Sequence, residues 1–442
     1  MASNSIIITT ASGTVGSANQ TLAGTGTPGA SIGIWNGNTQ VATTTVSNNG
    51  TWSVGVTLNL GNNTITANML ATMANFKSSV GMNPNGNLIA DAAGNLLGVA
   101  SLGGASNQGS IFQLSGNNYQ TITNILSFNG SNGAYPFSGL IEDSSGNIFG
   151  TTQLGGSGKS SVGTVFELSG ANHQTLTTLY SFNTGNAALP LSNLVMSASG
   201  SLIGATMQGG SFNKGTIFEL SGPNFQTYKT LVNFNGTNGY QPNYLMIDPS
   251  GRIFGLTTDG GSNNLGTVFQ LSGSDNSTVT TLVNFSAQTG NYPTSLIEDA
   301  NGNLFGVTIA GGSKGSGTIF ELNGANFQNF SVLYNFPTSN LENPSSNLVI
   351  DTAGNLYGEL SNLNGGSIFE LSGPTYQTFT TLNNFSGSNG GSPNQLAIIG
   401  GVLYGVTSSG GSNQNGTVFQ ITSTPTPTNL SYVPATTFHS PH

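Results

Sequence analysis

Two sets of phenylalanines recur with a common period and constrain the fold of this chain more than any other feature. The first set stands in copies of Gly-[Thr/Ser]-[Ile/Val]-Phe-[Glu/Gln]-[Leu/Ile], 49 to 54 residues apart: Phe112, Phe166, Phe218, Phe269, Phe320, Phe369 and Phe419. Each member of the second set precedes a proline by eight residues: Phe76, Phe128, Phe182, Phe234, Phe285, Phe336 and Phe385. A repeat of this period predicts a propeller, a solenoid or an array.

One clear copy of the repeat divides into four strands, and no part of it shows a helical period over ten residues. Its first two strands form a hairpin across residues 143–147, the third spans 163–168, and the fourth spans 175–182. Four strands per repeat are typical of the blade of a β-propeller.

The number of repeats predicts how the ring closes. The first three strands occur seven times after residue 85, but the fourth strand follows only six of them. The seventh copy of the fourth strand lies upstream, at residues 71–76, with Pro84 at the usual offset of eight. We therefore predict an all-β fold in which residues 69–422 form a seven-bladed β-propeller closed by an N-terminal outer strand, which removes two free sheet edges.

Residues 1–68 lack the repeat and alternate short apolar strands with Gly, Asn and Pro turns, which predicts a small β-sandwich. The segments 24–29 and 49–52 resemble the bacterial Ig-like modules of surface adhesins, and that resemblance implies a spacer. Residues 423–442 are rich in Pro and Thr, and we expect them to form a tail.

The units resemble the bacterial tandem repeat called GloVer (Gloeobacter/Verrucomicrobia) over about 350 residues. The resemblance rests on Gly-Asn-[Leu/Ile]-[Phe/Tyr/Leu]-Gly, Gly-Gly-Ser and Gly-Thr-[Val/Ile]-Phe-[Glu/Gln]-Leu. It implies an extracellular protein and brings no catalytic residues. Some members of the family end in a sorting tail, which this sequence lacks, so the means of anchoring stays open.

Charged residues make up only 5% of the chain, its net charge is −9, and it has no cysteine. No basic stripe is present, which argues against nucleic acid or an anionic membrane as a partner. The lack of cysteine excludes disulfides and thiolate metal sites. No run of about 18 apolar residues occurs, so we expect no membrane span. This composition resembles that of secreted or cell-surface bacterial proteins, although residues 1–5 do not read as a signal peptide.

Few residues offer catalytic chemistry. Aspartates recur at one turn position, where they could bind calcium or cap main-chain N–H groups, and we favour the cap: Asp91, Asp143, Asp248, Asp299 and Asp351. Adjacent carboxylates such as Glu142 and Asp143 point to opposite faces of a strand and make a poor hydrolytic pair. His173 is the one histidine inside the predicted domains, and we expect it on the surface. We therefore predict no catalytic residue, no metal site and no cofactor.

The remaining candidates are Tyr135, Tyr240 and Tyr292, which stand just before the repeated prolines on one face of the predicted ring. Exposed aromatic rings beside neutral amides and hydroxyls suit sugar ligands, while the alternative is that each tyrosine packs on its proline. We accordingly expect an extracellular, non-catalytic surface protein that acts in adhesion, glycan binding or surface and filament assembly, with glycans or other surface subunits as partners. The alternative is a secreted carbohydrate-active enzyme, either a polysaccharide lyase or a glycoside hydrolase, which the scarcity of His, Lys and Arg disfavours.

Overall fold

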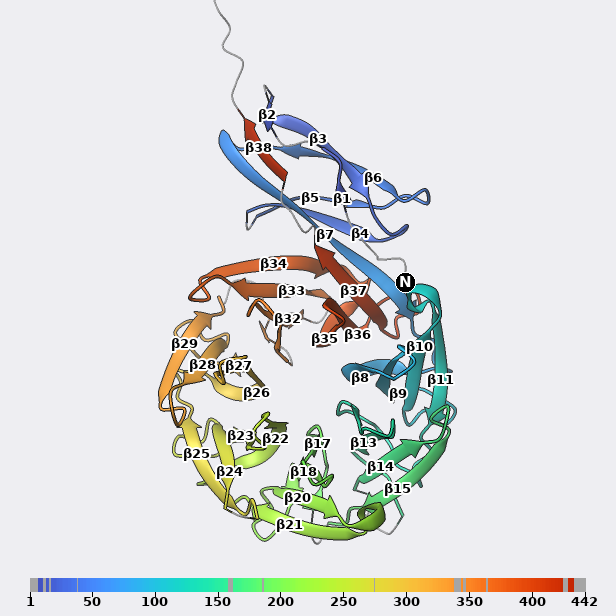
Figure 1. The fold of residues 1–442 in the computed structure, drawn as a ribbon, viewed down its shortest axis with the longest axis vertical. Helices are drawn as coiled ribbons and strands as arrows, with labels where there is room; N and C mark the ends of the chain where they lie inside the picture. Colours follow the sequence, from blue (N-terminus) through green and yellow to red (C-terminus); the bar gives the residue numbers. More distant parts are fainter. Residues whose placement is uncertain are drawn as a thin grey trace, which may run out of the picture.

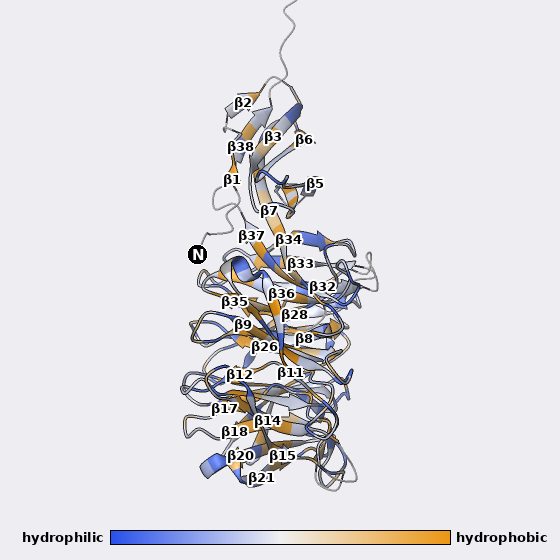
Figure 2. Ribbon diagram, turned by 90° about the vertical axis from the view of Figure 1, so that its right-hand side faces the viewer, coloured by the Kyte–Doolittle hydropathy of each residue, from blue (hydrophilic) through white to orange (hydrophobic). Residues whose placement is uncertain are grey.

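A computed structural model describes residues 7–432 except 11–12, 16, 38, 158–161, 185–186, 274, 338–342, 345–346, 363–364 and 424–427. The described residues form a β-propeller-like ring of sheets with a smaller β module outside it (Figure 1). The ring is seen edge-on in Figure 2, where the module extends beyond its rim. Apart from strands, this part of the chain contains two short 3₁₀ turns, η1 (Asn117–Tyr119) and η2 (Pro223–Phe225). Its helices are too short to cross a membrane.

Each sheet of the ring runs from an inner strand beside the central channel to an outer strand at the rim (Figure 1). We name each sheet after its inner strand. In chain order the ring sheets are β8 (Met82–Ala90), β9 (Leu96–Leu102), β10 (Ser110–Ser115), β11 (Thr121–Ser127); β12 (Ile141–Glu142), β13 (Ile148–Thr152), β14 (Thr164–Ser169), β15 (Thr175–Ser181); β17 (Val195–Met196), β18 (Leu202–Thr206), β20 (Thr216–Ser221), β21 (Thr227–Asn233); β22 (Tyr240–Ile247), β23 (Ile253–Asp259), β24 (Thr267–Ser272), β25 (Thr278–Asn284); β26 (Asn291–Glu298), β27 (Leu304–Ala310), β28 (Thr318–Asn323), β29 (Asn329–Asn335); β31 (Val349–Ile350) with β30 (Asn343–Pro344), β32 (Leu356–Asn362), β33 (Gly365–Ser372), β34 (Thr378–Phe385); and β35 (Gly391–Ile399), β36 (Val402–Ser409), β37 (Thr417–Ser423), β7 (Gly61–Asn75). A two-stranded sheet of β16 (Ala187–Ala188) and β19 (Gln208–Gly209) accompanies the β17 sheet.

The last ring sheet takes its outer strand from the N-terminal part of the chain. The lower half of β7 pairs antiparallel with β37, with Thr417 opposite Asn75 and Phe419 opposite Thr72. The predicted closure by an N-terminal outer strand is therefore confirmed. It leaves β37 with a partner on both edges, which removes an open edge from the ring.

The upper half of β7 leaves the ring and enters the N-terminal module. One sheet of the module contains β1 (Ile7–Ile8), β3 (Asn19–Thr25) and β6 (Thr51–Thr57). The other contains β5 (Thr39–Thr45), β4 (Ser31–Asn36), β7, β38 (Thr428–Tyr432) and β2 (Gly13–Val15). Their apolar faces meet in one core that includes Leu22, Ile32, Trp52 and Ile65.

Strand β38 lies in the segment for which we expected a tail. It pairs antiparallel with β7 and parallel with β2, and it buries Leu430 in the core of the module. The physical reason is that β7 continues past β37 and offers a further free edge, which Thr428–Tyr432 occupies. The rest of the expected tail, residues 424–427 and 433–442, lies outside the described residues.

The repeated phenylalanines join neighbouring sheets of the ring. All fourteen are at most 6% exposed, so these rings are buried in the structure. Each ring at the end of an outer strand packs against the third-strand phenylalanine of the next sheet, with centroids 4.8 to 5.5 Å apart. Phe76 makes this contact with Phe112 and so joins the last ring sheet to the first.

Two glycines of the repeat explain why these contacts can form. Gly255 lies opposite Phe269 on the adjacent strand, and a Cβ at Gly255 would lie 2.3 Å from the ring Cζ. Gly266 has φ +96° and admits the next sheet's proline, because a Cβ there would lie 2.7 Å from Pro293 Cδ. Close packing between sheets therefore fixes the glycine, the phenylalanine and the proline at constant offsets.

Candidate functional site

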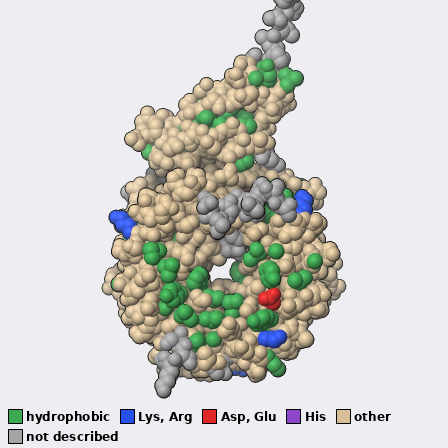
Figure 3. Space-filling model, turned by 180° about the vertical axis from the view of Figure 1, so that it is seen from behind, with side chains coloured by type: hydrophobic (Ala, Val, Ile, Leu, Met, Phe, Trp, Pro, Cys, Tyr) green, Lys and Arg blue, Asp and Glu red, His purple; other side chains and the backbone are tan. Residues whose placement is uncertain are grey.

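The ring encloses a central cavity of about 420 Å³. In the space-filling view the ring is hollow at its centre, and uncharged side chains surround most of the opening (Figure 3). Every ring sheet contributes to the wall, through residues that include Asn87, Ser138, Asn193, Tyr244, Thr294, Asn347 and Gln395. Among the described residues that line the cavity, none is Lys, Arg, Asp, Glu or His. The wall is therefore neutral but rich in hydrogen-bonding groups.

Amide side chains hold neighbouring inner strands together around this cavity. Asn193 Nδ2 donates to the carbonyl oxygen of Leu245 at 2.7 Å, and its Oδ1 accepts from the Leu245 N–H at 3.1 Å. Asn347 makes the same two bonds to Leu396, at 3.0 and 2.9 Å. Each amide thus makes the two hydrogen bonds that a neighbouring strand would make to the free edge of an inner strand. These bonds satisfy main-chain groups and hold adjacent inner strands at a fixed position in the cavity wall.

Other polar groups in the wall have no such partner. Asn243 Oδ1 and Thr294 Oγ1 are buried atoms without a hydrogen-bond partner among the described residues. Asn243 Nδ2 donates to the carbonyl oxygen of Pro293 at 2.9 Å, which fixes the orientation of that amide. Burial raises the pKa of Tyr244 to about 12, so its hydroxyl keeps its proton and can donate. Each of these buried polar groups marks a place where a polar ligand or a water molecule would complete the hydrogen bonding.

A buried carboxylate lies behind the same wall. Glu359 is 1% exposed, and its Oε2 accepts from the main-chain N–H of Asn347 at 3.4 Å. At its position in the second strand, the other ring sheets carry Val99, Thr151, Ala205, Leu256, Val307 and Val406. A carboxylate is costly to bury, so its presence where the repeat holds small or apolar side chains marks a candidate functional residue. Our reading of the sequence missed Glu359, although this break in the repeat would have identified it.

The three tyrosines expected to bind ligand are outside the cavity wall. Tyr135, Tyr240 and Tyr292 stand at or before the first strands of three different sheets, and none of them lines the cavity. Tyr292 is 39% exposed. Tyr240 lies under Lys214, whose Nζ is 5.6 Å from the ring centroid, and its hydroxyl accepts from Gln241 Nε2 at 3.1 Å. No contact brings the three rings together into one site.

The repeated aspartates cap turns, as we predicted. Asp143 Oδ1 accepts from the N–H groups of Ser145 and Asn147 at 2.8 and 2.9 Å, and its Oδ2 accepts from Asn147 Nδ2 at 2.9 Å. Each of the other four accepts the equivalent pair of main-chain bonds: Asp91, Asp248, Asp299 and Asp351. In the part of the chain that the structure describes, no three His, Cys, Asp or Glu side chains are grouped so that they could hold a metal ion.

His173 is not the surface residue that we expected. Its side chain is 12% exposed, and its Nε2 lies 3.9 Å from Asp91 Oδ2 in the preceding sheet. The equivalent loop position carries aromatic residues in other sheets, and Phe225 there packs on Phe149 with centroids 5.2 Å apart. Contact between sheets therefore explains the burial of His173.

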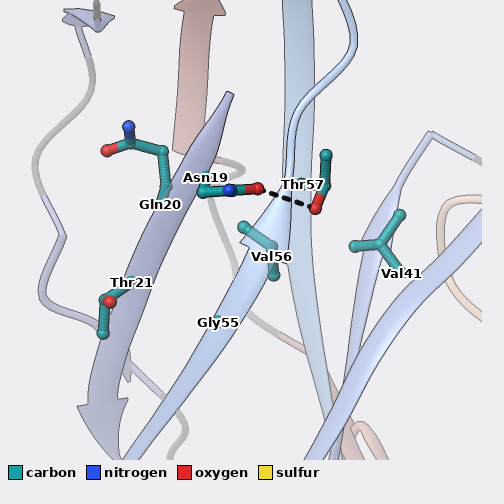
Figure 4. Close-up of a pocket in the computed structure, with 7 residues that line it drawn as sticks. All are labelled: Asn19, Gln20, Thr21, Val41, Gly55, Val56 and Thr57. Atoms are coloured by element: carbon teal, nitrogen blue, oxygen red, sulfur yellow. Dashed lines mark hydrogen bonds between the residues drawn. The ribbon is translucent and has the colours of Figure 1, made fainter. Parts of the chain in front are cut away.

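A second hollow, of about 500 Å³, lies on the N-terminal module (Figure 4). Strands β3, β5 and β6 line it with residues such as Gln20, Val41 and Val56, and Thr57 Oγ1 donates to Asn19 Oδ1 at 3.1 Å. None of the described residues that line it is titratable. It therefore offers no acid or base.

Comparison with known proteins identifies the repeat. The profile of the Gloeobacter/Verrucomicrobia repeat family matches residues 43–218 and 163–363. A search of curated proteins finds no match.

Three solved structures illustrate the likeness of fold. A protein described as a 6-phosphogluconolactonase from Bacteroides uniformis is 14% identical, with a TM-score of 0.48 and coverage of 81% of this chain and 96% of its own. An aldose sugar dehydrogenase from Streptomyces coelicolor is 11% identical, with a TM-score of 0.43 and coverage of 80% and 98%. A gluconolactonase from Xanthomonas campestris is 10% identical, with a TM-score of 0.42 and coverage of 80% and 89%.

These findings correct our functional expectation. We expected a non-catalytic surface protein and no enzyme, whereas the similar structures include lactonases and a sugar dehydrogenase. The expectation of a non-catalytic protein is therefore wrong. Because likeness at 10 to 14% identity describes the fold alone, the activity of this chain has to be argued from its own residues.

Proposed function

This chain belongs to the Gloeobacter/Verrucomicrobia repeat family, and we propose that its function lies in the cavity that the repeats enclose. We propose that it is a carbohydrate-active enzyme whose substrate is a neutral sugar or sugar derivative. The observation that carries this proposal is the cavity wall, which combines hydrogen-bonding groups with a complete lack of charge among its described residues.

The proposal assumes a particular architecture. We infer that the sheets of β8, β12, β17, β22, β26, β31 and β35 are the blades of a seven-bladed β-propeller. We infer further that the N-terminal module is an Ig-like sandwich, with β38 as an added strand. Ligand sites of closed β folds are commonly at the mouth or in the interior of the closed structure, which agrees with a site in the channel.

Neutral hydroxyl-bearing molecules fit this cavity better than charged ones. Asn243 Oδ1 can accept a bond from a hydroxyl group, Thr294 Oγ1 can donate or accept, and the protonated Tyr244 hydroxyl can donate. A phosphate or carboxylate group would meet no cationic side chain among the described lining residues. Its desolvation would therefore be uncompensated, which disfavours anionic substrates.

Glu359 supports turnover rather than binding alone. Hydrolysis or elimination needs a group that takes a proton, and general base catalysis is worth about 10²–10⁴-fold in rate. Glu359 is the carboxylate that contacts the main chain of the cavity wall, through the N–H of Asn347. We assign it the role of proton acceptor behind the cavity wall, where its Oε2 contacts the N–H of the lining residue Asn347.

The expected setting of this activity is extracellular. A chain with 5% charged residues and no cysteine fits a secreted or cell-surface protein, and glycans are the natural partners of a carbohydrate-active enzyme. Tyr135, Tyr240 and Tyr292 would contact only a substrate long enough to extend beyond the residues that line the cavity.

A turnover screen tests the proposal. The purified protein is incubated with neutral mono-, di- and polysaccharides and with sugar lactones, and products are followed by ¹H NMR. We expect turnover of at least one neutral compound, little dependence on salt because no charge lines the cavity, and a loss of about 100-fold or more in kcat for Glu359→Gln.

Two controls make this test decisive. Glu370→Gln replaces a carboxylate of strand β33 that no contact places at the cavity, and it should keep wild-type kcat. Thermal melting of both variants shows whether they are folded. Turnover by Glu359→Gln at the wild-type rate, or a wild-type protein inert toward every compound, would overturn the proposal.

A further inference from the structure

The residue that follows each repeated proline varies from sheet to sheet. Packing between sheets keeps one residue type at positions such as the repeated phenylalanines and prolines, but it does not do so here. The described residues at this position are Asn85, Phe137, Leu191, Asn243, Thr294 and Asn394. A position that varies between otherwise similar sheets can present different side chains to different sides of a bound ligand.

Two of these six side chains hydrogen-bond to each other between neighbouring sheets. Asn394 Nδ2 donates to Asn85 Oδ1, which joins the β35 sheet to the β8 sheet. Asn85 Nδ2 in turn donates to Ser101 Oγ at 3.1 Å. Neither Asn85 nor Asn394 lines the cavity. The other four all do, and they come from consecutive sheets.

These four divide into an apolar pair and a polar pair. Phe137 and Leu191 precede the inner strands β12 and β17, and Phe137 is 39% exposed although it is a large apolar side chain. Asn243 and Thr294 belong to β22 and β26 and hold the unpartnered Oδ1 and Oγ1 atoms. The cavity wall at this level is therefore apolar on one arc and hydrogen-bonding on the next.

We propose that Phe137, Leu191, Asn243 and Thr294 together determine which substrate the cavity accepts. The inference rests on the proposed function and names the substrate as an uncharged pyranose with one apolar face. That face stacks on the Phe137 ring beside Leu191, and hydroxyl groups at the opposite edge bond to Asn243 Oδ1 and Thr294 Oγ1. Uronic acids and phosphorylated sugars are excluded, because the described lining residues offer no cation.

Binding measurements in the Glu359→Gln background test this inference apart from turnover. The probes are glucose, galactose and N-acetylglucosamine, with glucuronate as the charged counterpart, and affinity is measured by NMR titration. We expect Phe137→Ala to weaken binding about 10-fold or more through lost apolar contact. We expect Thr294→Val, which keeps the shape and removes the hydroxyl, to weaken it about 3- to 10-fold.

Matched controls lie outside the cavity wall. Phe212→Ala removes a ring that is 57% exposed in a loop, and Thr39→Val changes an exposed residue of β5, and both should bind like the parent. A protein that neither binds nor turns over any neutral probe would overturn both the proposed function and this inference. Turnover that persists unchanged in Phe137→Ala and Thr294→Val, or tighter binding of glucuronate than of glucose, would overturn this inference alone.

Discussion

Phe182 and Phe218 show how single residues hold the ring together. Their rings meet edge to face with centroids 5.1 Å apart, and both are buried between neighbouring sheets. Gly204 lies opposite Phe218, and a Cβ there would lie 2.4 Å from the ring Cζ. The buried aromatic surface and the close approach of the glycine both stabilise this contact between sheets. Loss of one ring therefore leaves a cavity that the sheets cannot close.

Replacing Phe218 by Ala should lower the free energy of unfolding by about 3–5 kcal/mol, measured by urea denaturation. Phe212→Ala in a nearby loop removes a ring that is 57% exposed and should change it by less than about 0.5 kcal/mol. Equal effects of the two substitutions would mean that the contact between sheets contributes little.

Asp248 gives the ring a defined sensitivity to acid. Burial by itself raises the pKa of Asp248, but hydrogen bonds from Ser250 and Arg252 and the charge of Arg252 outweigh this and hold the pKa below its usual value. A lowered folded pKa stabilises the protein above the unfolded value, and this contribution is lost as pH falls through the folded value.

The free energy of unfolding should therefore fall as the pH drops below the ordinary aspartate value of 3.8. Asp248→Asn should weaken that dependence, as followed by denaturation at a series of pH values. A variant with the same pH profile as the wild type would show that Asp248 does not contribute.

At the scale of elements, β7 joins two cores. Its lower half completes the ring against β37, and its upper half lies between β4 and β38 in the N-terminal module. Leu430 of β38 is 2% exposed in the core of that module. The C-terminal strand therefore stabilises the module at the opposite end of the chain.

We expect Leu430→Ala to lower the stability of the N-terminal module by about 2–5 kcal/mol and to leave the ring almost unchanged. Hydrogen exchange should show faster exchange in β3 and β6 but not in β24. Ser431→Ala, a neighbouring residue that is partly exposed, is the control. Uniform exchange in the Leu430 variant would contradict this account.

The strands of the ring could be predicted because each repeat carries its own packing positions in order along the chain. The closure by residues 71–76 could be predicted because the offset of Pro84 from Phe76 is local. Strand β38 could not be, since its partner β7 is far away in sequence and a Pro/Thr-rich segment precedes it. The cavity residues were missed for a related reason. Nothing within a single repeat distinguishes Phe137 or Thr294, and the two residues line one cavity only because the ring brings different repeats to the same channel.

At the scale of the whole molecule, the closing strand should decide whether the ring is stable. A chain of residues 68–423 keeps the pairing of β7 with β37, and a chain of residues 78–423 loses it together with Phe76. We expect the longer chain to melt cooperatively as a monomer and the shorter one to melt at lower temperature and associate through the exposed edge of β37. Identical melting of the two chains in calorimetry and light scattering would contradict this.

The functional site that we propose is the central cavity, with Glu359 as proton acceptor and with Phe137 and Thr294 on the cavity wall. The most direct test is a crystal structure of the Glu359→Gln variant bound to the neutral sugar that the wild type turns over fastest. We predict density for the sugar in the cavity, stacked on Phe137 and bonded to Thr294 Oγ1. Density for the sugar at Tyr135, Tyr240 or Tyr292, or in the hollow of the N-terminal module, with an empty cavity, would contradict it.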